Sequence, residues 1–411
     1  MRIYAFEGYR YAAGPSEAGE LAAPPFDQID DQLRDQLQAT HPFHFTHLTR
    51  PLPGPEGDPY QHAAALHQQW CREARVQRDV QPCLYPYTIH MPDGGRRLGL
   101  CTLVGVEPEG SNVIRPHEKT LAKPFADRLN LLRSMQVDVE PVMFLADDAG
   151  ELEALLEEDV KSAPVVEHHD AAGNVHRLFR VADAERIAAY RQALARYPAA
   201  IADGHHRYKV GRTYAEEVGA AEGTAAGCKM AVLFSLRDQH LVIDPIHRAL
   251  AEGHDLKPLY DLIRSRQPLA VTDGNAVAAA VAAAEQPALA VQEHGKAPEL
   301  WLLDPKQMPK GTPPGAAQLA VAHLHYVLLP ALGLPPEAAL DGTVTYRADP
   351  QNLYRQLAAG DFQLGVWLPP MTADAFGKAI SKGDLLPAKS TRFLPKLASG
   401  MVWAGHDARL G

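Results

Sequence analysis

The sequence predicts a mixed α/β protein, and three observations support that class. Apolar runs of strand length alternate with stretches long enough for helices along the 411 residues. Two pairs of strand-like runs are each joined by a short polar turn, as in β-hairpins: 83–90 with 97–106, and a pair within 163–182. A hydrophobic content of 46% with 22% charged residues is ordinary for a globular protein, so the chain can bury a sizeable core.

In the first part of the chain, helices and strands are expected in turn. Asp30 is an acidic residue of the kind that caps helices, and it opens the first expected helix, 30–40. Further helices are expected at 60–76, 126–135, 150–160, 183–197 and 208–220. Strands outside the two hairpins are expected at 44–49, 141–145, 198–202, 230–235 and 241–245, and the last two should pair around Arg237 and Asp238.

A second, smaller α/β domain is expected beyond residue 250, where alanine increases and histidines become fewer. A chain of 411 residues accommodates two domains, and the expected boundaries are 1–250 and 251–411. Helices and strands alternate in the second part at 256–264, 275–285, 288–293, 299–303, 315–332, 351–359, 362–368 and 372–382.

Composition disfavours several classes of protein. The formal net charge is −10, so nucleic acid is not an expected partner, and the charge suits a small anionic ligand held in a local basic pocket. The 4 cysteines form no C-x-x-C pair, which argues against a disulfide framework and favours a reducing cytoplasm. No apolar run approaches about 20 residues, and the N-terminus lacks the pattern of a signal peptide, so no membrane association is expected. H-E-x-x-H, G-x-S-x-G and a G-x-G-x-x-G after a strand are absent, so zincin, serine-hydrolase and Rossmann sites have no support.

The most informative motif is Asp203-Gly204-His205-His206-Arg207, which lies between an apolar run and an expected helix. At such a junction, backbone N–H groups and the positive end of the helix dipole face one point. Gly204 permits a close backbone approach or a positive φ. Arg207 can fork onto a phosphate or carboxylate, and the two imidazoles can move protons. The motif therefore predicts an anion or nucleotide site, with a structural turn as the alternative.

Two further segments carry residue types suited to phosphate chemistry. The first is His117-Glu118-Lys119-Thr120, followed by Lys123, Asp127 and Arg128. It combines cations that hold charge with a carboxylate that can move a proton or bind Mg²⁺. The second is Lys389-Ser390-Thr391-Arg392 with Lys396, where hydroxyl groups adjoin lysines but no glycine-rich loop precedes them. Each segment alone is also compatible with a solvated surface turn.

Two groups of histidines are interpreted as weaker signals. His41, His44 and His47 recur every three residues in and just before the expected strand 44–49, a spacing that does not aim three rings at one metal. His168 and His169 precede Asp170 in an expected loop and are interpreted as solvated. No metal site is predicted from either group.

Four motifs in order resemble the domain of unknown function 1015 family of bacteria and archaea. They are Ala23-Pro24-Pro25-Phe26-Asp27, the His117 segment with Asp127-Arg128, the Asp203 pentad with Ala202, and Pro387-Ala388-Lys389-Ser390-Thr391 with Pro395-Lys396. The chain departs from the family pattern at His247, often Asn, and at Ala388, often Pro. The pentad is also similar to the phosphate-gripping turn of the ParB/sulfiredoxin-like fold. This similarity implies such a fold, binding phosphate or nucleotide, for 1–250, and the smaller domain 251–411 would contribute the Lys-Ser-Thr motif.

Together these observations favour small-molecule phosphate chemistry of kinase or phosphatase type. The resemblance suggests serine or phosphoserine as the substrate, with a nucleotide and Mg²⁺ as cofactors. The three phosphate-type segments are expected to meet in one pocket. The expected catalytic residues are Glu118, Asp203, His205 and His206. The expected phosphate-binding residues are His117, Lys119, Thr120, Arg128, Gly204, Arg207, Lys389, Ser390, Thr391 and Lys396.

Two other functions stay open. One is a non-catalytic nucleotide-binding regulator or chromosome-partition-like module, although no helix-turn-helix with basic flanks is found. The other is a metal-dependent hydrolase that uses His117, His205 and His206.

Overall fold

The computed structural model describes residues 1–55, 57–118, 122–263, 265–312, 314–335, 342–381 and 385–411. They form two compact units. Unit 1 comprises Met1–Pro116, Thr120–Leu241 and Pro395–Gly411, and unit 2 comprises His117–Lys119 and Val242–Leu394. The mixed α/β class predicted from the sequence is confirmed. The units differ from the boundary predicted at residue 250, because the chain enters unit 2 at Val242 and returns to unit 1 for its last segment.

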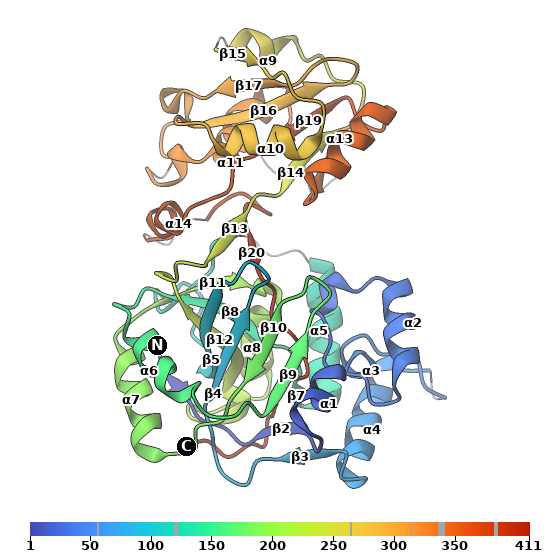
Figure 1. Ribbon diagram of the computed structural model, residues 1–411, viewed down its shortest axis with the longest axis vertical. Helices are drawn as coiled ribbons and strands as arrows, with labels where there is room; N and C mark the ends of the chain where they lie inside the picture. The colour runs from blue at the N-terminus through green and yellow to red at the C-terminus, as the bar shows by residue number, and fades with distance from the viewer. Residues whose placement is uncertain (56, 119–121, 264, 313, 336–341, 382–384) are drawn as a thin grey trace. The chain divides into compact units, whose positions relative to one another are not determined.

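In the described part of unit 1, a nine-stranded sheet has the order β6-β11-β8-β12-β5-β4-β10-β9, and β1 pairs with β5 (Figure 1). Its strands are β1 (Ile3–Tyr4), β4 (Tyr85–His90), β5 (Arg96–Gly105), β6 (Ile114–Arg115), β8 (Val142–Ala146), β9 (Val166–His169), β10 (Val175–Leu178), β11 (Ala199–Asp203) and β12 (Cys228–Ser235). Both predicted hairpins are confirmed: β4 pairs with β5, and β9 with β10, in antiparallel register.

The central strand β12 explains one wrong prediction. Every residue of β12 is buried, because β12 pairs in parallel with β8 on one edge and antiparallel with β5 on the other. No edge of β12 remains for the hairpin predicted with 241–245. That segment forms β13 (Val242–Asp244) in unit 2, where it pairs with β20 (Arg392–Leu394).

Six helices in the described part of unit 1 lie at predicted positions, whereas the helices Pro15–Glu20 and Thr46–Thr49 were not predicted. The helices of this unit are α1 (Pro15–Glu20), α2 (Asp31–Thr40), α3 (Thr46–Thr49), α4 (Pro59–Arg72), α5 (Ala122–Met135), α6 (Glu151–Asp159), α7 (Ala184–Ala195) and α8 (His205–Glu217), with short 3-10 turns η1 (Phe26–Gln28) and η2 (Ala225–Gly227). Asp30 begins α2, as predicted, since its carboxylate accepts a hydrogen bond from the Leu33 N–H at 2.8 Å. In Figure 1, α6 and α7 lie beside each other next to the strands, and α5 lies across the sheet from them. No helix among the described residues combines the length and apolar character that crossing a membrane requires.

The strand predicted at 44–49 is wrong, because this segment forms the short helix α3. Phe45 and Leu48, three residues apart, are both fully buried, which fits a helical period and not a strand period. The His44 ring starts the turn by accepting a hydrogen bond from the Thr46 N–H at 3.3 Å.

A small sheet returns the C-terminal segment to unit 1. Its order is β3-β2-β21-β7, with β2 (Gly8–Tyr11), β3 (Val76–Arg78), β7 (Val137–Asp138) and β21 (Trp403–Gly405). Gly411 N–H and Ala5 N–H each donate to the other residue's carbonyl, at 3.0 and 3.2 Å. These pairings fix the path of residues 395–411 and so position Lys396.

Unit 2 is built on a six-stranded sheet of order β15-β17-β16-β19-β14-β18. Side chains alternate between its two faces with the strand period: Leu289 and Val291 enter one apolar cluster, and Ala288 and Ala290 the other. The strands are β14 (His247–Leu250), β15 (Arg266–Pro268), β16 (Ala288–Glu293), β17 (Glu299–Leu302), β18 (Val344–Arg347) and β19 (Leu364–Trp367). The helices are α9 (Lys257–Leu262), α10 (Gly274–Ala282), α11 (Ala320–His323), the π-helical turn η5 (Leu324–Leu328), α12 (Leu329–Ala331), α13 (Pro350–Ala359) and α14 (Ala373–Ile380), with 3-10 turns η3 (Pro305–Gln307) and η4 (Ala316–Gln318).

Candidate functional site

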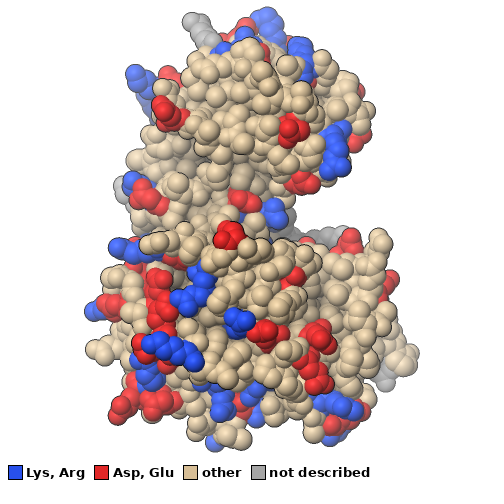
Figure 2. Space-filling model, viewed as in Figure 1, with Lys and Arg blue, Asp and Glu red and all other residues tan. Residues whose placement is uncertain are grey.

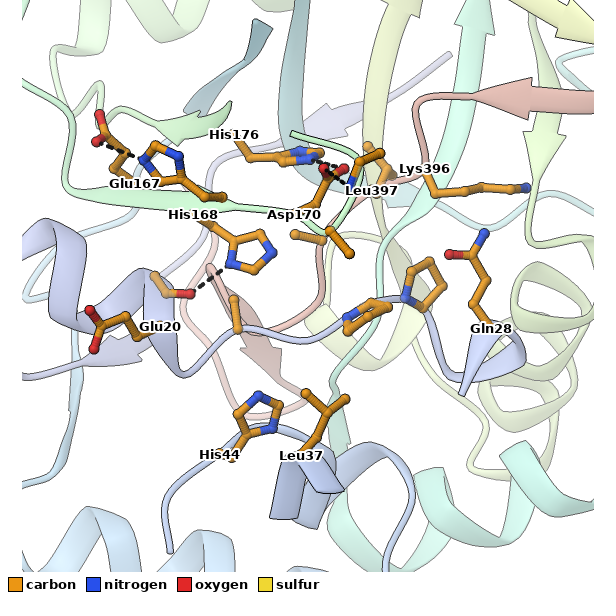
Figure 3. A pocket seen from close by; sticks show the side chains of 18 of the residues that line it. Glu20, Gln28, Leu37, His44, Glu167, His168, Asp170, His176, Lys396 and Leu397 are labelled. Atoms are coloured by element: carbon orange, nitrogen blue, oxygen red, sulfur yellow. Dashed lines mark hydrogen bonds and ion pairs between the residues drawn. The ribbon is translucent and has the colours of Figure 1, made fainter. Parts of the chain in front are cut away.

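Unit 1 contains a cavity of about 780 Å³ between α1, the turn after it, α2, the β9–β10 hairpin and the C-terminal segment (Figure 3). Small-molecule sites typically occupy ~300–1,000 Å³, so this volume suits a metabolite or nucleotide. The apolar part of the wall comes from Ala22, Pro24, Pro25, Leu33, Leu37, Ala171, Ala172, Leu397 and Ala398. The polar part comes from Ser16, Glu20, Gln28, His44, Glu167, His168, His169, Asp170, His176 and Lys396, and Gly19 completes the lining.

Close packing of α1 on β9 shapes one side of the cavity. A Cβ atom on Gly19 would lie 1.7 Å from the Glu167 carbonyl oxygen, so only glycine fits between the helix and the strand. The Gly19 carbonyl in turn contacts the His168 ring, with 2.7 Å between the oxygen and Nδ1. This contact fixes the orientation of the imidazole at the cavity wall.

Four histidines line the cavity, and three of them lie on two opposite sides of it. In Figure 3, His168 and His176 lie on the β9–β10 side, and His44 lies opposite them near Leu37. Burial lowers the pKa of His44 to about 4, and burial likewise lowers the pKa of His168. His176 is held by the Tyr87 hydroxyl at 2.8 Å and the Asp170 carboxylate at 3.2 Å. His44 is therefore neutral at pH 7 and can both donate and accept hydrogen bonds.

The two ends of the cavity carry opposite charges. Lys396 and Gln28 lie at one end in Figure 3, and Glu20 and Glu167 lie at the other. Lys396 is the sole Lys or Arg among the described residues that line this cavity. An anionic group of a ligand is therefore attracted to the Lys396 end.

Lys396 connects the cavity to the Asp203 pentad. Its ammonium forms an ion pair with Asp203, whose other oxygen accepts from the Arg207 guanidinium at 2.5 Å. Burial acts to raise the pKa of Asp203, but the charges of Lys396 and Arg207 outweigh it and hold that pKa well below its usual value. Asp203 is therefore ionised at neutral pH and orients the cation of the cavity.

The pentad forms the predicted junction of strand, turn and helix. β11 ends at Asp203, Gly204 has φ of 94°, and α8 begins at His205. Arg207 is buried and donates at 2.6 Å to the Pro141 carbonyl as well as to Asp203, so two of its donor groups fix the local backbone. His205 is buried and His206 half-buried in the first turn of α8.

Arg128 has a comparable buried position beneath the turn at 23–27. Its guanidinium stacks over the Phe26 ring at 4.2 Å from the centroid. It donates to the Thr49 carbonyl at 2.8 Å and pairs with the carboxylates of Asp127 and Glu140. Glu140 also accepts the Phe26 N–H at 2.9 Å, so Arg128 and Glu140 hold the turn that lines the cavity.

Five of the predicted site residues that the structure describes lie in unit 2. Glu118 accepts the backbone N–H of Lys389 at 2.9 Å. The His117 ring contacts the Thr391 hydroxyl at 2.7 Å, and the Ser390 hydroxyl donates to the Pro387 carbonyl at 2.5 Å. The structure thus brings the His117-Glu118 segment and the Lys389-Ser390-Thr391 segment together, although about 270 residues separate them in sequence. Lys119 and Thr120, and the side chain of Lys123, lie outside the described residues.

The predicted residues therefore form one group in unit 1, with Asp203, Arg207 and Lys396, and one in unit 2. That all three segments meet in one pocket stays a prediction. Sequence reasoning missed the histidines that line the cavity: His168 lies in β9 and not in a solvated loop, and His44 is buried. Alternation of Val166 and His168 within the predicted hairpin was the available signal. Among the described residues, no three His, Cys, Asp or Glu side chains come together to hold a metal ion.

A comparison with protein-family models gives one match. The family model described as "Protein of unknown function (DUF1015)" matches residues 3–306. The match includes the turn at 23–27, the His117 segment and the pentad, and it ends before the Lys389 segment. No match is found among curated protein sequences.

Three solved structures are similar over 72% of this chain. "Free serine kinase in complex with AMP" is 13% identical, with 87% of that chain covered and a TM-score of 0.39. A conserved hypothetical protein from Pyrococcus furiosus is 10% identical, with 90% covered and a TM-score of 0.36. SbnI with a C-terminal truncation, from Staphylococcus aureus, is 13% identical, with 84% covered and a TM-score of 0.39.

Proposed function

The chain belongs to the DUF1015 family of proteins of unknown function, and we propose that unit 1 binds a nucleotide or a small phosphorylated metabolite in its cavity. We further propose that it transfers or removes a phosphoryl group there. The observation that carries the proposal is the position of Lys396, whose ammonium lines the cavity while Asp203 holds it against the Arg207 turn. This gives a preorganised cation at one end of a cavity of metabolite size.

The electrostatics of the wall specify the orientation of the ligand. Its phosphate belongs at the Lys396 end, where an ammonium and the Gln28 amide can donate hydrogen bonds. The carboxylates of Glu20 and Glu167 at the other end favour a ligand with amino or hydroxyl donors there. Nucleotides have this distribution of charge and donors, and phosphoserine offers an ammonium donor, beside its carboxylate, at the end opposite its phosphate.

The remaining wall suits the organic part of such a ligand. Pro24, Pro25 and Leu37 offer apolar contact area. The neutral His44 ring can hydrogen-bond a ribose hydroxyl or a heterocyclic base without adding charge. A cavity of mostly apolar wall with a few convergent polar groups is typical of small-molecule sites.

Asp203 is the proposed base in this chemistry. In the free protein its two cationic partners make it a weak base. A phosphate that draws the Lys396 ammonium towards itself removes one partner and so raises the proton affinity of Asp203. His205 or His206, in the first turn of α8, is the proposed acid, and the phosphate-gripping role of the turn at 203–207 belongs to the same proposal. Because no three-ligand metal group occurs among the described residues, Mg²⁺ is expected to arrive with nucleotide phosphates and not to occupy a protein cage.

A second function, binding without turnover, is favoured by one observation. Asp203 is already paired with Lys396 and Arg207, which suits a structural carboxylate better than a reactive one. In that case the cavity belongs to a nucleotide-binding regulator.

A binding screen with a matched pair of variants tests the proposal. Thermal unfolding is measured with ADP, ATP and phosphoserine, with and without Mg²⁺, and phosphate release or transfer is then assayed for each ligand that binds. A ligand present at 100 times its Kd adds about 2.7 kcal/mol of stability. Lys396→Gln should weaken binding at least about tenfold, since a charge-assisted hydrogen bond is worth ~1.5–3 kcal/mol.

Lys161→Gln is the control, because Lys161 is 66% exposed, its ion pair is with Glu158, and neither residue lines the cavity. Equal ligand stabilisation in Lys396→Gln and wild type, or no stabilisation of the wild type by any of these ligands, contradicts the proposal. Binding without turnover selects the second function.

A further inference from the structure

The loop Pro387–Thr391 of unit 2 has an unusual backbone. Lys389 has φ of 57°, in the left-handed region that costs a residue with a side chain roughly 1 kcal/mol or more. The structure fixes this conformation from two sides, through Arg248 on one and through His117 and Glu118 on the other. Strain that is held so firmly is characteristic of binding loops.

Arg248 is the buried support of the loop. Its side chain is 1% exposed, and its guanidinium donates to the carbonyls of Ala388 and Lys389 at 3.2 and 3.0 Å. It also lies over the Tyr346 ring at 4.5 Å and contacts His325 Nε2 at 3.3 Å. Within the described residues it has no carboxylate ion pair, so its positive charge is not cancelled by direct contact.

The second support of Arg248 comes from an uncommon helix geometry. His325 is buried within η5, a π-helical turn. π-helical turns are rare and often occur at functional sites, because the extra residue aims a side chain that a regular helix would point elsewhere. Here that side chain faces Arg248, so two departures from regular backbone geometry, at 324–328 and at Lys389, converge on one guanidinium.

The Lys389 N–H and the hydroxyls of Ser390 and Thr391 already have partners, and a few other groups of the loop are left for a ligand. Both carbonyls, of Ala388 and Lys389, are used by Arg248. No hydrogen bond from the backbone N–H groups of Ser390 and Thr391 to any described residue is found. The Lys389 side chain is exposed and has no ion-pair partner in the part of the chain that the structure describes. Two successive N–H groups beside a left-handed residue form the kind of concavity that binds anions.

We propose that the loop Pro387–Thr391 is an anion-binding site in its own right, which takes a phosphoryl group. Lys389 contacts the phosphate through its ammonium, the N–H groups of Ser390 and Thr391 donate to its oxygens, and Arg248 is the positioning residue that keeps the loop in this shape. The site lies entirely in unit 2 and does not depend on the ligand proposed for the cavity of unit 1.

The test is a titration of the full chain with inorganic phosphate, followed by NMR at the backbone amides of Ser390 and Thr391, with chloride as the control for ionic strength. Phosphate should shift both amides in the wild type and also in Lys396→Gln, which removes the cation of the unit 1 cavity. Lys389→Gln should weaken this binding about tenfold. Lys378→Gln is the matched control, since Lys378 is 72% exposed on α14 and pairs with Asp374.

Arg248→Lys separates positioning from mere stability. It keeps the buried charge but lacks the planar fork that bonds the Ile246 carbonyl together with the two loop carbonyls, so phosphate affinity should fall while the amide signals of β15 and β17, away from the substituted strand, stay unchanged. Unshifted Ser390 and Thr391 amides in the wild type overturn the proposal, as does unchanged affinity in Lys389→Gln. Loss of the shifts in Lys396→Gln overturns the independence of the site, whereas failure of the nucleotide screen alone leaves it intact.

Discussion

The ion pair between Lys396 and Asp203 should couple the stability of unit 1 to the geometry of its cavity. We consider Lys396→Met and Asp203→Asn, singly and together. Side-chain exposures of 16% and 18% place the pair between a surface and a fully buried one. Surface pairs contribute ~0–1 kcal/mol, whereas breaking a buried pair costs ~3–5 kcal/mol.

The size of the loss in the free energy of unfolding depends on which charged partners remain after each substitution. After Lys396→Met, Asp203 keeps Arg207 as a partner, so the free energy of unfolding should fall by about 2 kcal/mol. After Asp203→Asn, two cations face each other without their shared carboxylate, so the loss should be about 3 kcal/mol. The double variant should lose about 3 kcal/mol as well, which gives a coupling free energy of about 2 kcal/mol.

Urea unfolding, followed by tryptophan fluorescence, measures these values. Unit 1 contains Trp70 and Trp403, both packed around Tyr11, so a background in which Trp301 and Trp367 of unit 2 are replaced by Phe reports on unit 1 alone. In thermal unfolding, Lys396→Met should lower the Tm by about 4–8 °C. A coupling free energy below about 0.5 kcal/mol would place the pair in the surface class and refute the argument that Asp203 holds Lys396 in place.

Three further predictions concern single groups. Arg207→Lys should lower the free energy of unfolding of unit 1 by about 1–3 kcal/mol in urea, since lysine cannot serve both Asp203 and the Pro141 carbonyl; unchanged stability would contradict this structural role. Glu118→Ala should speed hydrogen exchange at the Lys389 amide, whereas Glu118→Gln keeps an acceptor oxygen and should not; equal exchange in both variants would show that the contact is not needed. Stability should fall as pH drops from about 6.5 towards 4, by up to about 1.4 kcal/mol per pH unit for each histidine that is neutral when folded but takes up a proton on unfolding. Urea midpoints between pH 7 and 4.5 measure this, and a flat profile would contradict it. The unit 1 histidines whose pKa burial lowers to about 4 are His44, His67 and His406.

Much of the secondary structure could be predicted because local signals and tertiary structure agree. Acidic caps begin α2 and α7, and alternation marks both hairpins. Prediction failed where the pairing of a strand depends on strands that are distant in the sequence. The segment 242–244 has the composition of a strand, but whether β12 has a free edge depends on β8 and β5, which lie about 90 and 130 residues earlier.

Among the described residues that line the cavity, Lys396 is the one that the sequence predicts as a site residue, and the arrangement of the wall could not be predicted. The pentad was found at a junction of strand and helix, with positive φ at Gly204, as its sequence indicated. The cavity itself could not be found, because its wall combines α1, a β-hairpin and a C-terminal segment that is brought back by β21. No local pattern encodes that Gly19 packs on Glu167 or that Lys396 reaches Asp203.

The charged motif residues divide into two groups by what they contact. Arg128, Arg207 and Arg248 are buried and use their donors on backbone carbonyls, at Thr49, at Pro141 and at Ala388 and Lys389. A guanidinium suits this task because it remains charged and offers five donors in a fixed plane. The two motif lysines whose side chains the structure describes, Lys396 and Lys389, end instead at a cavity wall and on an exposed loop. These three arginines therefore shape the backbone, and these two lysines lie where an anion can reach them. This division explains why a motif rich in phosphate-type residues can be largely structural and still define a binding site. Replacing the lysines should therefore remove binding, and replacing the arginines should disturb the geometry of the site.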